Sequence, residues 1–144
     1  MATLEETIDA RLNAIAGLAA LVGARIYRAA RARGSILPAI VYTRISRTVV
    51  NHAGGQTDTQ QARFQVDVYA DADTEVQQIA DLVKGETTGG TPSGLSGWTH
   101  TGEAPYVTSC LLLSEIAGDE PGDTGAEDSR VFRRIQDYAL WFNL

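Results

Sequence analysis

Apolar positions near the middle of the chain change their spacing once, and that change predicts the centre of the fold. Apolar and polar residues alternate over 62–70, which is typical of a strand with one buried face. Apolar residues then recur every three or four positions over 76–83, as on one face of a helix. We therefore expect a strand followed directly by a helix, with candidate N-cap residues at Asp71, Asp73 and Thr74.

The N-terminal segment has the pattern of a long amphipathic helix. Thr3 and Glu6 have the spacing of a capping box, and apolar residues then recur every three or four positions. These apolar residues are Leu4, Ile8, Leu12, Ile15, Leu18 and Val22. The pattern predicts one helix over residues 4–21, followed by Gly23 at a position where glycine often ends a helix.

Three further segments have the composition of strands. Residues 39–46 and 106–116 are rich in apolar, β-branched and aromatic side chains and start next to a proline. Residues 131–142 are apolar in both registers, which predicts a strand inside the sheet or one covered by a neighbouring subunit. The other expected features are short extended segments at 25–27 and 98–100 and loops at 28–35, 85–94 and 118–128.

The polar segment over residues 47–60 has two open interpretations. Gly54 and Gly55 either form a short turn between two long strands, or the whole segment is a flexible loop. The flanking runs contain few apolar residues that could pack against a core. This composition fits a long hairpin that extends beyond the core. A segment that cannot bury itself within its own domain often contacts a partner instead.

The order of these elements predicts an α+β fold formed by a single domain over residues 1–144. We expect two layers: one mostly antiparallel sheet of four or five strands, with two helices packed on one face. The other face is expected to be neither fully apolar and buried nor fully polar and exposed. This mixed character fits a subunit interface. Its predicted residues are Tyr42, Tyr69 or Tyr138 together with Arg63, Gln65 and Asp67.

Composition narrows the class of protein without naming a function. The chain has 144 residues, 44% of them hydrophobic and 21% charged, which is ordinary for one soluble domain. A net charge of −6 argues against a surface that grips the nucleic acid backbone. No apolar run has the length of a membrane span, and the N-terminal residues are acidic rather than basic. We expect a protein that stays in a reducing cytoplasm or in a particle assembled there.

Residues suited to catalysis or metal binding are scattered along the chain. His52, His100 and Cys110 stand singly, so no metal site is predicted. The apolar run around Cys110 predicts a buried, inert thiol. We expect no catalytic site and no cofactor. A small hydrolase or metal-dependent enzyme is an alternative that would need a pocket holding His52 or His100 beside an acid with a perturbed pKa.

Five short segments occur in a characteristic order: 21–27, 37–42, the Gly54-Gly55 hairpin, 62–70 and 133–141. In this order they resemble the tail-completion, or tail-terminator, proteins of long-tailed bacteriophages and gene transfer agents. The resemblance implies a structural virion protein that forms a hexameric ring at the head–tail junction. Such a ring caps the tail tube, ends polymerisation of the tube protein and docks to the head–tail connector. A head-completion or connector adaptor protein is the alternative.

If the chain forms such a ring, its own sequence suggests which residues would serve it. DNA is expected to pass through the ring without specific binding, and the particle is assembled in the bacterial cytoplasm. We expect the ring or partner interface at Val49, Val50, His52, Gln56, Arg63, Tyr69 and Trp141. An acidic loop that would repel DNA in the lumen contains Asp119, Glu120, Asp123, Glu127 and Asp128.

Overall fold

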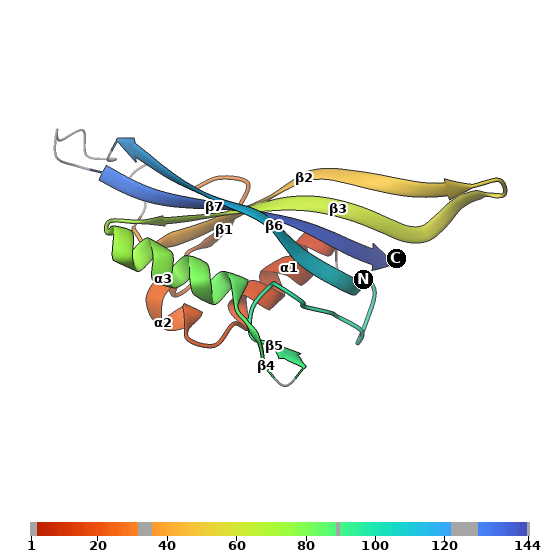
Figure 1. The fold of residues 1–144 in the computed structure, drawn as a ribbon, viewed down its shortest axis with the longest axis horizontal. Helices are drawn as coiled ribbons and strands as arrows, with labels where there is room; N and C mark the ends of the chain where they lie inside the picture. Colours follow the sequence, from red (N-terminus) through yellow and green to blue (C-terminus); the bar gives the residue numbers. More distant parts are fainter. Residues whose placement is uncertain (1–2, 32–35, 89, 122–129, 144) are drawn as a thin grey trace.

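A five-stranded sheet in the order β1-β2-β3-β7-β6 forms the centre of the molecule (Figure 1). The computed structural model describes residues 3–31, 36–88, 90–121 and 130–143. The strands of this sheet are β1 (Ile26–Arg28), β2 (Ala39–His52), β3 (Gly55–Ala70), β6 (Tyr106–Pro121) and β7 (Arg130–Asn143). β1 is parallel to β2, and the other neighbouring strands are antiparallel. The predicted α+β fold is confirmed, and β7 lies inside the sheet as expected.

Helices α1 (Leu4–Asn13), α2 (Leu18–Val22) and α3 (Asp73–Lys84) all lie on one side of the sheet (Figure 1). Every residue of the predicted N-terminal apolar stripe is buried, so the stripe is confirmed. The prediction of one continuous helix over residues 4–21 is wrong, because the chain breaks between α1 and α2. Gly17 at this break has a φ of 82°, a left-handed conformation that a helix interior excludes.

Capping groups at both ends of this N-terminal region are those that the sequence predicts. The Thr3 N–H donates to Glu6 Oε2 at 2.8 Å, and the Glu6 N–H donates to Thr3 Oγ1 at 3.1 Å. These two bonds form the predicted capping box at the start of α1. Gly23 follows α2 with a φ of 57°, which confirms its expected place after the helix.

Helix α3 is held against β7 by a buried arginine. The apolar face predicted for this helix is fully buried: Val76, Ile79, Ala80 and Val83. An N-cap at Asp71, Asp73 or Thr74 is a wrong prediction, since the N-cap is Ala72 without a side-chain bond. Asp73 instead pairs with Arg134 of β7, its Oδ1 lying 2.6 Å from Nη2. The acid that could have capped the helix therefore ties it to the sheet.

A buried polar chain links β7 to α3 and β6 beneath the helices. Gln136, which is fully buried, donates from Nε2 to Ala80 O at 2.9 Å and to Glu115 Oε1 at 3.0 Å. Its Oε1 accepts a hydrogen bond of 2.7 Å from the hydroxyl of Tyr138. Burial raises the pKa of Tyr138 above its usual range, so the hydroxyl keeps the proton that it donates.

Two of the tyrosines expected on the helix-free face lie on the other face. The Tyr138 ring stacks on Phe64 of the core, with centroids 5.2 Å apart and planes 13° apart. Tyr42 pairs in register with the buried Val66, and burial together with the nearby Asp9 raises its pKa to about 12. Alternation shows which residues share a face, whereas the pairing register decides which face the helices cover. Tyr69 lies on the helix-free face as predicted.

The segment over residues 47–60 is a long hairpin, so the turn interpretation is confirmed and the loop interpretation is wrong. β2 and β3 pair from Ala39 with Tyr69 to His52 with Gly55, close to the tip. Figure 1 shows that this hairpin extends well beyond the helices. We call the part formed by residues 47–60 the arm. Since little of the domain lies beside the arm, the backbone hydrogen bonds between β2 and β3 are its main source of stability.

The connection after α3 is more regular than the predicted loop over residues 85–94. It contains a small hairpin of β4 (Thr87–Thr88) and β5 (Thr91–Pro92). The chain then crosses the end of α3, where the Leu95 N–H donates to Val83 O at 2.8 Å. The short strand expected at residues 98–100 is reduced to a single bridge between His100 and Val107. This connection therefore caps the C-terminus of α3.

Replacing Gln136 by Leu should lower the free energy of unfolding by about 2–4 kcal/mol, because the Tyr138 hydroxyl and Ala80 O lose buried partners. Tyr138→Phe should cost about 1 kcal/mol, and the double variant should lose less than the sum of both. Gln78→Leu, at an exposed position of α3, is the matched control. Urea unfolding measures all four changes, and a Gln136→Leu protein as stable as the control would contradict the buried chain.

Replacing Gly94 by Ala should destabilise the crossing over the end of α3. A Cβ atom there would lie 2.5 Å from Val83 O and 2.7 Å from the Gly85 nitrogen, so the backbone must shift. We expect a loss of at least about 2 kcal/mol. Gly102→Ala is the control, since nothing lies near its Cβ position. Thermal unfolding followed by circular dichroism compares the two, and equal midpoints would show that the crossing is not tightly packed.

Candidate assembly surface

Three of the predicted interface residues lie on the helix-free face of the sheet. Arg63 and Tyr69 belong to β3, where they alternate with residues of the core. Trp141 belongs to β7 and pairs in register with Gln61 of β3, so it lies on the same face. Arg63 is exposed, and the other two are half-buried. The structure therefore brings these three residues onto one surface.

One end of this face is a closed polar network around Tyr69. Asp67 is buried and receives Arg133 Nη2 at 2.7 Å and Gln65 Nε2 at 2.8 Å. The Tyr69 ring lies 4.6 Å from the guanidinium of Arg31 and 5.4 Å from that of Arg133. Cation–π contacts of this kind hold an aromatic ring in place. Groups of the chain itself therefore already surround Tyr69.

The other end of the face has weaker polar contacts. Arg63 lies 3.7 Å from Asp137, and their side chains are 49% and 25% exposed. Water screens such an exposed pair, so it contributes little to stability. The Ser114 hydroxyl also donates to Asp137, over a long distance of 3.4 Å. These charges can change partners at low cost when another protein approaches.

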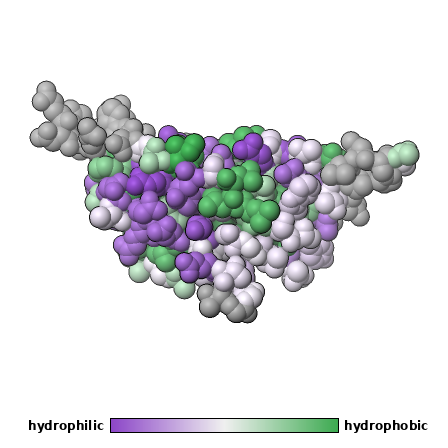
Figure 2. Space-filling view, viewed as in Figure 1, coloured by the Kyte–Doolittle hydropathy of each residue, from purple (hydrophilic) through white to green (hydrophobic). Residues whose placement is uncertain are grey.

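Large apolar side chains are exposed on two strands at or near opposite borders of the sheet. On β6, Leu111, Leu113 and Ile116 are 51%, 52% and 56% exposed, and on β2, Ile45 is 54% exposed. Leu111 and Ile116 lie on the helix-free face, because they pair with Ala139 and Ile135. Figure 2 shows apolar side chains at the surface over β6, beside a hydrophilic area over α3.

Sequence reasoning did not select these apolar residues, although one signal was present. A strand with one buried face cannot bury the consecutive residues 111–113, so part of that leucine run must be exposed. Ile45 had no such signal, because it sits at an irregularity in the pairing between Arg44 and Ser46. A bulge of this kind is not visible in a hydrophobic pattern.

Predicted interface residues on the arm form a second group. Val49 is half-buried and pairs with Gln60. The backbones of Val50, His52 and Gln56 belong to the same hairpin, and their side chains lie outside the part of the chain that the structure describes. These residues occupy the far end of the hairpin, whereas Arg63 and Tyr69 lie further along β3. The structure therefore separates the predicted interface into an arm and a sheet face.

The first residues of the predicted acidic loop lie in a strand. Asp119 and Glu120 belong to the end of β6, where they pair with Phe132 and Val131 of β7. Their assignment to a loop is wrong, because β6 continues to Pro121. The other acids of this prediction lie outside the described residues: Asp123, Glu127 and Asp128.

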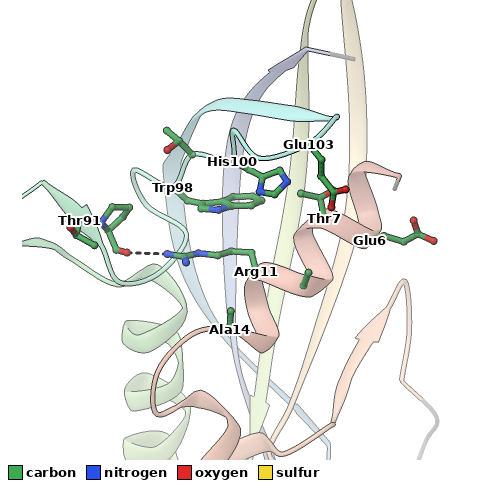
Figure 3. Close-up of a pocket in the computed structure, with 11 residues that line it drawn as sticks. Glu6, Thr7, Arg11, Ala14, Thr91, Trp98, His100 and Glu103 are labelled. Carbon is green, nitrogen blue, oxygen red and sulfur yellow. Dashed lines mark hydrogen bonds between the residues drawn. The ribbon is translucent and has the colours of Figure 1, made fainter. Parts of the chain in front are cut away.

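A cleft of about 490 Å³ lies between α1 and the connection that precedes β6 (Figure 3). Arg11 of α1 extends along it and donates from Nη2 to Pro92 O at 3.0 Å and to Gly94 O at 2.8 Å. The indole of Trp98 lies beside this guanidinium, with its centroid 6.0 Å away. These contacts join α1 to the connection, so the cleft wall has a clear structural role.

Several groups in and near this cleft belong to residue types that the enzyme alternative requires. The cleft contains His100, which the enzyme alternative required, together with Glu6 and Glu103. The Glu6 carboxylate is held in the capping box of α1. Cys110 is fully buried, as predicted, and burial raises its pKa to about 12, which favours the unreactive thiol form. In the described ranges, no group of three His, Cys, Asp or Glu residues could hold a metal ion.

None of the helices among the described residues is both long and apolar enough to cross a membrane. The family model "Tail completion protein gp17" matches residues 6–102, which is more than half of the chain. No curated protein matches. Among solved structures, a chain of the virion of a native gene transfer agent particle is similar, with a TM-score of 0.65 and 18% sequence identity. The alignment covers 95% of this chain and 92% of that chain.

These comparisons carry different weights. At 18% identity, the structural similarity shows a shared fold and nothing more. The family match spans α1, the arm, β3, α3 and the connection that follows it. It confirms the resemblance inferred from the order of the sequence segments. The chain therefore belongs to the tail completion protein gp17 family and is a structural protein of a virion tail.

Proposed function

We propose that this chain is a tail terminator whose copies form a hexameric ring at the head–tail junction. The ring caps the tail tube, stops further addition of tube protein and docks to the head–tail connector or adaptor. Membership of the tail completion family is the observation that carries this proposal. The gene transfer agent virion from which the similar chain comes supports a role within a particle.

The shape of the subunit suits this role. In a head-to-tail ring each subunit uses two different surfaces. We expect the arm to supply one, with Val49, Val50, His52 and Gln56. The helix-free face would supply the other, with Arg63 and Trp141 beside Tyr69, whose ring Arg31 and Arg133 already contact. The weak contact between Arg63 and Asp137 leaves charges that a neighbouring subunit could engage.

Charge supports free passage of DNA through such a ring. The chain carries a net charge of −6, so its surface would repel phosphate groups rather than bind them. In the proposed ring, the acidic stretch that begins at the end of β6 lines the lumen. Its residues are Asp119, Glu120, Asp123, Glu127 and Asp128. DNA would then slide through without a specific contact.

Capping of tail tubes should be directly measurable. Native mass spectrometry of the chain, alone and with purified tail tubes, should give the mass of a six-membered ring. Tube protein polymerising in vitro should stop elongating when the chain is added, as electron microscopy of tube lengths would show. Bovine serum albumin at equal concentration is the control. Tubes that keep growing would contradict the proposal, and binding to capsids instead of tubes would favour the head-completion alternative.

Shortening the arm should prevent ring formation and leave the fold intact. Replacing residues 50–59 by Asn-Gly keeps the pair between Val49 and Gln60 and closes it with a two-residue turn. We expect a folded monomer, because the described core lies outside this segment. Ala53→Ser, an exposed change that keeps the full arm, is the control. Light scattering measures the mass, and a shortened protein with the mass of the ring would refute a role for the arm.

A further inference from the structure

Both borders of the sheet have stretches without a paired strand. β1 covers β2 only at residues 40–42, so within the described chain the outer edge of β2 is open from Thr43 to His52. At the opposite border, His100 bridges Val107 and the Gly97 N–H donates to Cys110 O at 2.8 Å, so among the described residues the outer edge of β6 is open from Leu111 to Pro121. Such edges carry unpaired N–H and C=O groups that can pair with another strand.

These edges have only part of the usual protection against pairing. Edge strands are often blunted by lysine, proline, other charged side chains or β-bulges. Both edges have irregularities in their pairing register, and each carries a charged residue. However, the only lysine of the chain is Lys84, in α3, and the only proline in either open edge is Pro121 at the end of β6. Each edge also carries exposed apolar side chains, Ile45 on β2 and Leu113 on β6 among them. Long edges with exposed apolar groups indicate a partner.

Charges on the two edges have opposite sign and lie on the same face. Arg47 of β2 pairs in register with the buried Ala62, which places it on the helix-bearing face, and it is exposed. Glu115 of β6 pairs with the buried Gln136, on that same face, and is exposed too. In a continuous sheet, side chains on one face of adjacent strands become neighbours. An Arg47 edge and a Glu115 edge would therefore attract each other.

The directions of β2 and β6 would also allow these two edges to pair between copies. β2, β3, β7 and β6 alternate in direction across the sheet, so β2 and β6 run oppositely within one subunit. When two copies stand side by side in the same orientation, β6 of one meets β2 of the other in antiparallel fashion. The alternation then continues from one subunit to the next without a break.

We infer that, in the ring proposed above, the open edge of β6 pairs with the open edge of β2 from a second copy of this chain. The inference rests on the proposed ring and adds the contact that closes it. This contact is head-to-tail, because two different edges meet, and such contacts form a ring when the rotation between successive copies closes. Pairing of like edges is disfavoured, since it would oppose Arg47 to Arg47 or Glu115 to Glu115.

Charge reversal at exposed positions of the two edges tests the pairing. Glu115→Arg also removes the carboxylate that accepts a hydrogen bond from Gln136 Nε2, so the folding of this variant is checked separately. One variant, Ile45→Glu with Arg47→Glu, makes the β2 edge acidic. The other, Leu113→Arg with Glu115→Arg, makes the β6 edge basic. Each variant alone should lose the ring and remain a monomer, whereas an equal mixture should regain the ring mass. In that mixture, each altered edge meets its complement, and each natural edge does too.

Native mass spectrometry, in the conditions where the wild-type chain forms a ring, measures these masses. Ile36→Glu is the control, since Ile36 is exposed and lies outside both open edges; circular dichroism checks that all variants fold. Rings from either variant alone, or a mixture that stays monomeric, would overturn the edge pairing and leave the ring itself standing. A wild-type chain that forms no ring, alone or on tail tubes, would instead count against the proposed function.

Discussion

The length difference between strands and helices is the constraint on which the rest of this structure depends. β3 has 16 residues and spans about 50 Å, since an extended strand rises about 3.3 Å per residue. α3 has 12 residues and spans about 18 Å, at 1.5 Å per residue. Helices of this size cannot cover strands of that size. Part of the sheet must therefore project beyond the core, and the arm is one such part.

Within the covered part of the sheet, polar groups are committed to structure. Gln136 bonds to α3 and β6, Arg134 bonds to Asp73, and Arg11 bonds to main-chain carbonyls. A catalytic site needs groups that can exchange a partner for a substrate, and these groups cannot do so without cost to the fold. The exchangeable contacts lie instead on the surface, where Arg63 and Asp137 meet loosely. This distribution fits a subunit of an assembly.

Periodicity predicted most of the fold because local burial sets it. The apolar positions of α3 follow one helical face, and the capping box of Thr3 and Glu6 needs only neighbouring residues. The wrong predictions concern features that depend on residues far apart in the sequence. The face on which Tyr42 and Tyr138 lie depends on their pairing register with β3. The break at Gly17 divides the predicted helix in two, and the apolar residues of both parts still pack against the sheet. Order and spacing of short segments nevertheless identified the family.

Candidate surface residues were harder to predict for the same reason. Arg63 and Tyr69 were found because polar residues that alternate with a core must face outwards. Leu111 and Ile116 were not selected, because a leucine run is as typical of a buried strand as of an exposed one. Their exposure follows from the sheet order, which leaves β6 at the border with no helix over that face. The leucine run shows that part of residues 111–113 must be exposed, but no local pattern shows which part.

The unpaired backbone N–H and C=O groups at these sheet borders need hydrogen-bond partners in any stable particle. A sheet with two open edges tends to add further strands, and uncontrolled addition produces aggregates. When the two edges differ in charge, addition in one orientation is favoured, and rotation between successive copies can bring the last subunit back to the first. A closed ring leaves no open edge, so further growth through the edges ends. The same feature that makes an isolated subunit prone to association would then limit the size of the assembly that it forms.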